Sequence, residues 1–98
     1  MFRRQREELK IKIPRKIKVG ALVYKVEIVD YLQKDWIGET THSNLTVKIL
    51  RGTPEGMENT FWHELIHCFN SALGPEETIQ MLANSLHNFI KDNPRIFK

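Results

Sequence analysis

Apolar and polar residues alternate in short runs through the first half of the chain, which is the pattern of half-buried β-strands. The run at 23–29 (VYKVEIV) is rich in β-branched residues and places Lys and Glu opposite its aromatic and aliphatic side chains. A weaker alternation from 11 to 19, interrupted by Pro14, predicts another strand. Gly20 and Ala21 can turn the chain between the two strands.

A second pair of strands is expected further on. Leu45–Leu50 (LTVKIL) alternates with period two and places Val47 and Ile49 on one face. Trp36–Thr41 is a candidate short strand, and residues 42–44 between the two runs (His-Ser-Asn) have turn character. We therefore predict an antiparallel hairpin from these two runs.

The period changes to that of a helix after Gly52. Thr53 is a suitable N-cap and Pro54 a suitable first helical residue, and the helix is predicted to continue to about Leu73 before Gly74. One half of this helix is apolar: Phe61, Trp62, Leu65, Ile66, Cys68, Phe69, Ala72 and Leu73. The other half is polar: Thr60, His63, Glu64, His67, Asn70 and Ser71.

A second helix is predicted from Pro75 to about Asp92, where Asn93-Pro94 stops it. Its expected core face is Ile79, Leu82, Ala83, Leu86, Phe89 and Ile90. The whole pattern predicts an α+β fold, in which a small, mainly antiparallel sheet of three or four strands packs on two helices. We expect a single domain over residues 1–98, with 1–10 as a flexible basic arm.

The polar half of the first helix contains the pattern His63-Glu64-Leu65-Ile66-His67, an HExxH motif. Residues four apart on a helix are turned by only about 40° and separated by about 6 Å along the axis, so both imidazoles can bind one Zn²⁺. Glu64 lies about 100° round from His63, beside the metal, where a general base would act on a zinc-bound water. The simpler alternative is a pair of histidines on the solvated face of an amphipathic helix.

A catalytic zinc site usually has a third protein ligand, and Glu76 and Glu77 are the acidic candidates just downstream. Taking about 100° per residue, Glu76 lies at the margin of the apolar arc of the second helix, whereas Glu77 points away from it. The margin faces the neighbouring helix and stays near solvent, which favours Glu76. Glu77 remains the alternative, because acidic residues in a first turn also act as helix-dipole partners.

The run 60–69 (TFWHELIHCF) fits the extended signature of zincin metallopeptidases. In so short a chain it resembles the minigluzincins and the small HExxH proteins of phages and prophages, over roughly 45–92. This resemblance implies a zinc site, a glutamate ligand on the next helix and a peptidase-type fold. It also implies that a peptide or protein substrate binds along an edge strand of the sheet. Minigluzincins are latent through a terminal segment, so Arg95–Lys98 or the N-terminal arm would be the blocking segment here.

Gluzincins carry the third ligand in an E-x-x-x-D pattern, in which the aspartate orients a zinc-bound histidine. Glu76 fits the first position, but Gln80 stands where the aspartate is expected. Gln80 could accept a hydrogen bond from a ligand imidazole, although it would add no negative charge.

Other candidates are weaker. His87 lies about 16 Å along the helix from Glu76, too far for the same metal. Tyr24, Tyr31 and His42 are polar groups that could stabilise an oxyanion, and none is favoured by the sequence.

Composition limits the alternatives. The net charge is +3, with basic residues crowded at the start of the chain, and there is one cysteine, Cys68, expected to pack in the core. No apolar run is long enough for a membrane span, and the N-terminus lacks the apolar core of a secretory signal, so we expect a cytoplasmic protein.

The leading expectation is a zinc metallopeptidase. The alternatives are a catalytically weak, zinc-stabilised protein-binding module and, with only the N-terminal charge in its favour, a nucleic-acid-associated protein.

Overall fold

The computed structural model of the protein describes residues 12–69 and 75–95, and within them the chain folds as α+β, as predicted. Four strands are followed by two helices: β1 (Lys16–Val19), β2 (Leu22–Val29), β3 (Gly38–Thr41), β4 (Thr46–Leu50), α1 (Pro54–Phe69) and α2 (Glu76–Asp92). The predicted basic arm at 1–10, the continuation of the first helix over 70–73 and the end of the chain at 96–98 lie outside the described residues.

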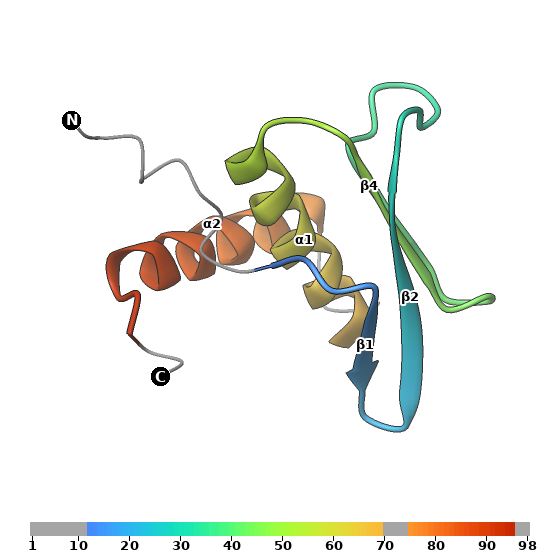
Figure 1. The fold of residues 1–98 in the computed structure, drawn as a ribbon, viewed down its shortest axis with the longest axis horizontal. Coiled ribbons are helices and arrows are strands. Elements are labelled where there is room, and N and C mark those ends of the chain that lie inside the picture. Colours follow the sequence, from blue (N-terminus) through green and yellow to red (C-terminus); the bar gives the residue numbers. More distant parts are fainter. Residues whose placement is uncertain (1–11, 70–74, 96–98) are drawn as a thin grey trace.

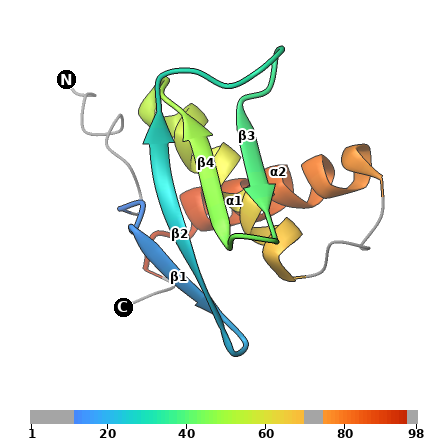
Figure 2. The same cartoon turned by 90° about the vertical axis from the view of Figure 1, so that its right-hand side faces the viewer.

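The four strands form one sheet in the order β1-β2-β4-β3 (Figure 2). β1 and β2 are an antiparallel hairpin whose turn begins at Gly20, with a φ of +63°, a conformation that glycine adopts without steric cost. β3 and β4 form the predicted antiparallel hairpin. β2 and β4 pair in parallel, so the sheet is mixed, and β3 is left at an edge.

The second hairpin is shorter than its alternation predicts. Leu45 has a φ of +52°, in the left-handed region, and β4 therefore begins at Thr46. Trp36 and Ile37 precede β3, which begins only at Gly38. Val47 and Ile49 on β4 have no exposed surface, as their shared face predicts.

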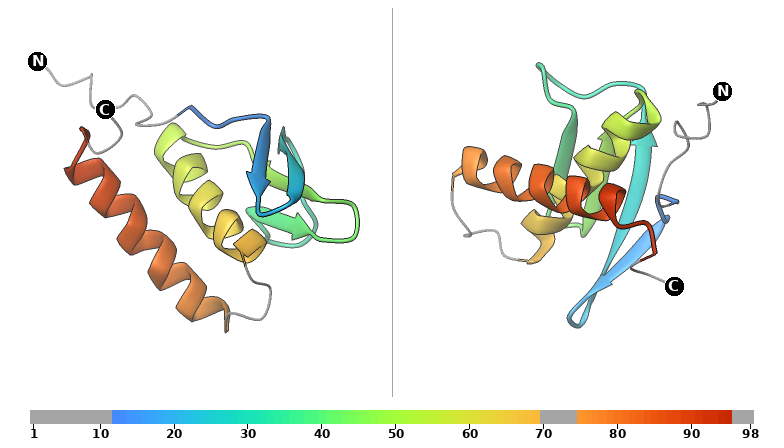
Figure 3. Two further views of the ribbon diagram at one scale, coloured as in Figure 1. Left: turned by 90° about the horizontal axis from the view of Figure 1, so that it is seen from below. Right: turned by 90° about the vertical axis from the view of Figure 1, so that its left-hand side faces the viewer.

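Helix α1 lies between the sheet and α2 (Figure 1; Figure 3, left). Thr53 is its N-cap, because its hydroxyl accepts a hydrogen bond from the backbone N–H of Gly56 at 3.0 Å. Tyr24 and Val26 of β2 join the apolar side of α1 in the core. Neither helix of the described chain is long and apolar enough to cross a membrane.

Helix α2 packs on α1 through a narrow apolar face. Ile79 and Ala83 are fully buried there and Ile90 nearly so, but Leu82 is 46% exposed and Phe89 50% exposed. The prediction that these two belong to the core is wrong. Within residues 12–69 and 75–95, α1 is the one element that covers α2 closely, so the buried arc of α2 is narrower than its apolar arc. Phe69, on the apolar half of α1 at its end, is also exposed.

Ile79→Ala should lower the free energy of unfolding by about 2–5 kcal/mol, because it leaves a cavity between the helices. Leu82→Ala, three residues away and half exposed, should cost less than about 1 kcal/mol. Urea unfolding followed by circular dichroism measures both, and a larger loss for Leu82→Ala would contradict the packing of α2 described above.

Candidate metal centre

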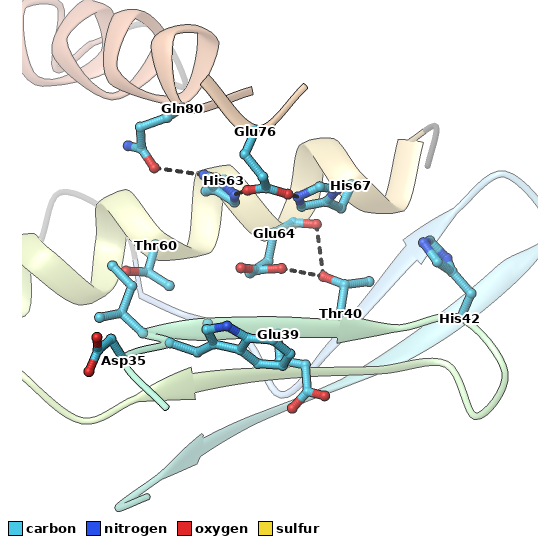
Figure 4. A pocket seen from close by; sticks show the side chains of 13 residues that line it. Asp35, Glu39, Thr40, His42, Thr60, His63, Glu64, His67, Glu76 and Gln80 are labelled. Carbon is cyan, nitrogen blue, oxygen red and sulfur yellow. Dashed lines mark hydrogen bonds and ion pairs between the residues drawn. The ribbon is translucent and has the colours of Figure 1, made fainter. Parts of the chain in front are cut away.

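Three potential ligand side chains converge where the start of α2 meets α1 (Figure 4). His63 and His67 project from one face of α1, with ring centroids 5.0 Å apart. The carboxylate of Glu76 lies between them, with Oε1 2.9 Å from Nε2 of His63 and Oε2 3.0 Å from Nε2 of His67. All candidate ligand atoms lie within 4.8 Å of one another, so the three residues are a candidate metal-binding group, called the metal-binding group below.

The donor set suits a divalent metal. Two imidazole nitrogens and one carboxylate oxygen are a ligand set that catalytic zinc sites use with one position left open. Both imidazoles are largely buried, whereas the Glu76 side chain is exposed, so the group is reachable from solvent on one side. Glu77, the alternative third ligand, is not part of the group, and no other such group of His, Cys, Asp or Glu occurs in residues 12–69 and 75–95.

The other nitrogen of His63 is held by Gln80. Oε1 of Gln80 lies 2.7 Å from Nδ1 of His63, as the spacing in the second helix suggests. The orientation of this amide is set by its NH₂ group, which donates to Oδ1 of Asn59 at 3.0 Å and to Oδ1 of Asn84 at 2.8 Å. Nδ1 of His63 therefore donates to Gln80, and Nε2, which lies 2.9 Å from Oε1 of Glu76, is the nitrogen left to bind a metal.

Glu64 is buried between α1 and β3, not on an open polar face as the helical pattern implies. Its Oε1 accepts a hydrogen bond of 2.6 Å from the hydroxyl of Thr40. A Cβ added at Gly38 would lie 2.6 Å from its other oxygen, so only glycine leaves room for the carboxylate. Burial raises the pKa of Glu64, while the Thr40 hydrogen bond and the two imidazoles lower it and the nearby Glu76 charge raises it.

Neither Thr40 nor Gly38 was identified from the sequence. Their strand was predicted, but the pattern of a strand gives no information about which side chain of a distant helix will face it.

A groove of about 630 Å³ opens over the metal-binding group and Glu64. β3 and the residues before it form one wall, and Trp36 and Ile37 contribute exposed apolar surface there. Asp35 and Glu39 add acidic side chains to the same wall.

His42 also lines this groove, at the turn after β3. Its Nδ1 lies 2.9 Å from the hydroxyl of Tyr24, a side chain with only 1% of its surface exposed. Burial raises the pKa of Tyr24, so the phenol keeps its proton and can donate to or accept from this nitrogen. Tyr31, by contrast, is 76% exposed and does not line the groove.

Two further candidate residues, Cys68 and His87, are buried away from the groove. Cys68 is buried in the core as expected, and burial with the nearby Glu64 charge raises the pKa of its thiol to about 11, which keeps it unreactive. His87 is buried away from the metal-binding group, 3.5 Å from Glu58.

Comparison with known proteins gives no match to a family model, a curated protein or a solved structure. The interpretation of the site therefore depends on its own geometry.

Zinc retention should show whether Glu76 or Glu77 is the third metal ligand. Glu76→Gln removes a carboxylate that lies within 3.0 Å of both histidines, so we expect the variant to lose most of its bound zinc after dialysis. Glu77→Gln changes the charge by the same amount one residue away and should retain it. Elemental analysis of both proteins gives the result, and a greater loss from Glu77→Gln would reverse the assignment.

Proposed function

We propose that this protein is a zinc-dependent peptidase of the gluzincin type. The observation that supports it best is the joint placement of the three candidate ligands and of Glu64 along one groove. His63, His67 and Glu76 would hold the zinc. When bound there, zinc would lower the pKa of a coordinated water and polarise the carbonyl of the substrate.

Glu64 is suited to the role of general base. Its carboxylate lines the groove beside the two histidines, and Thr40 and Gly38 limit the directions it can take. We propose that it accepts a proton from the attacking water and later returns it to the leaving amine.

Edge strand β3 offers backbone groups to an extended peptide. The N–H of Leu50 donates to the carbonyl of Ile37 at 2.9 Å, and hydrogen-bonded pairs alternate along an antiparallel ladder. The N–H and C=O groups of Gly38 and Thr40 therefore point away from β4, along the side of β3 that no other strand covers. A substrate strand added there would run beside Glu64 and the metal-binding group.

His42 is the preferred candidate for stabilising the oxyanion. Of the three polar groups considered from the sequence, it alone lines the groove, and a hydrogen bond with the hydroxyl of Tyr24 orients its ring.

Glu64→Gln should bind zinc normally and lose turnover by roughly 10²–10⁴-fold, because the amide keeps the size of the side chain without its basicity. The measurement is cleavage of an unfolded protein substrate at equal zinc occupancy, with Glu77→Gln as the control of equal charge. Equal turnover by wild type and Glu64→Gln would exclude Glu64 as the base.

One observation favours a second function, a zinc-stabilised protein-binding module with little turnover. The residue behind His63 is the neutral Gln80, so the imidazole lacks the adjacent negative charge that increases ligand basicity. Zinc-loaded protein that binds an unfolded chain but never cleaves it would support this function over the peptidase.

A further inference from the structure

A continuous row of polar side chains leads from the metal-binding group into the interior between the two helices. Gln80, behind His63, donates its NH₂ to Oδ1 of Asn59 at 3.0 Å. Nδ2 of Asn59 lies 3.3 Å from Nδ1 of His87. Nε2 of His87 in turn lies 3.5 Å from a carboxylate oxygen of Glu58, which is longer than an ordinary hydrogen bond.

The far end of this row is deeply buried. Glu58 is 2% exposed and His87 4% exposed, although both are titratable residues of a kind that is rarely buried without a partner. Neither touches the groove over the metal-binding group. The proposed peptidase mechanism does not use them.

The donors in this row all point the same way. His63 donates from Nδ1 to Gln80, Gln80 donates to Asn59, and Asn59 donates to Nδ1 of His87. Nδ1 of a neutral His87 is thus an acceptor, and its proton is on Nε2, the nitrogen that faces Glu58. Each group donates an N–H to the next group in the row, and the last acceptor is a carboxylate oxygen of Glu58.

The reverse row would require both histidines to change tautomer and three amides to rotate together. Gln80 and Asn59 would rotate by 180°, so that Gln80 donated to Nδ1 of His63. Asn84 would have to rotate with them, because its Oδ1 accepts from Gln80 at 2.8 Å and from Asn59 at 3.1 Å. His63 would then carry its proton on Nε2 and could not bind a metal there. In that reverse row the lone pair of His87 Nε2 would face the carboxylate of Glu58, which is unfavourable in a buried site of low dielectric constant.

We propose that Glu58 and His87 are positioning residues that select the metal-binding tautomer of His63 through Asn59 and Gln80. This inference rests on the proposed binding of zinc by His63. It also explains how the neutral Gln80 can orient His63 at the position where gluzincins have an aspartate. The carboxylate that fixes the tautomer would be that of Glu58, at the other end of the row.

The tautomers provide a direct test in the full-length protein. Long-range ¹H–¹⁵N correlation spectra of imidazole rings distinguish a proton on Nδ1 from one on Nε2. In the zinc-loaded protein we expect the Nδ1–H form for His63 and the Nε2–H form for His87. An Nδ1–H or doubly protonated His87 would overturn the proposal, because either form needs Asn59 to accept where the row requires it to donate.

Zinc affinity, measured by competition with a chromophoric chelator, tests the coupling. Glu58→Met keeps the approximate size of the side chain but removes the acceptor, so the reverse row is no longer disfavoured. We expect its zinc affinity to fall roughly tenfold, the lower end of what hydrogen-bond partners behind a ligand contribute. Glu55→Met, on the same helix, removes a carboxylate that pairs with Lys91 across the same two helices and should bind zinc as the wild type does.

A second substitution separates this role from a merely structural one. Asn59→Asp, added to Glu58→Met, supplies oxygens that can only accept, so Gln80 must again donate to this position and accept from His63. Zinc affinity should return to within about threefold of the wild type. Normal affinity in Glu58→Met, or no recovery in the folded double variant, would overturn the proposal.

Zinc binding and peptide cleavage by the wild type distinguish a failure of this inference from a failure of the proposed function. If the wild type binds zinc but cleaves nothing, the peptidase proposal fails and the affinity series still decides the role of Glu58. If the wild type binds no zinc, the proposed function and the role of Glu58 and His87 in metal binding fail together. In that case the tautomer of His87 in the metal-free protein shows whether the row itself exists.

Discussion

Helix α1 is packed between a sheet and a second helix, and the cost of burying its polar side chains without partners governs the rest of the structure. A helix covered on two sides has few positions that face water. Its buried polar groups must then be paired by the neighbouring elements. Thr40 of β3 donates to Glu64, Gln80 of α2 contacts His63, and His87 of α2 lies 3.5 Å from Glu58, whereas the buried indole N–H of Trp62 has no hydrogen-bond partner within the described part of the chain. The groove residues and the interior row are two results of the same requirement.

The position of α2 has two consequences for chemistry. Its first residue, Glu76, reaches both histidines of α1, and the next turn supplies the amide behind His63. A carboxylate held directly against that imidazole would be close to solvent and partly screened, whereas one buried at the far end of a hydrogen-bonded row is shielded from water. The neutral Gln80 need not weaken the site, provided that Asn59 holds it in the observed orientation.

Strand β3 belongs both to the sheet and to the site. The parallel pairing of β2 with β4 leaves it at the edge, where one side of its backbone has no partner strand among the described residues. Exposed edges promote aggregation, and a strand of four residues limits that risk while leaving backbone groups for the proposed peptide substrate. Gly38 is constrained by both roles, since a larger residue would displace Glu64 from its place behind the strand.

The sequence by itself determined what depends on the geometry of a single element. The spacing of the two histidines and the preference for Glu76 over Glu77 follow from the angle per residue along one helix axis. The cap at Thr53 follows from its residue type and from the proline after it. The tertiary structure decided the parallel pairing of β2 with β4, the exposure of Leu82 and the partners of Glu58. Periodicity gives the direction of a side chain relative to its own axis. Which neighbour covers that direction, and how wide an arc it covers, is set only when the elements pack together.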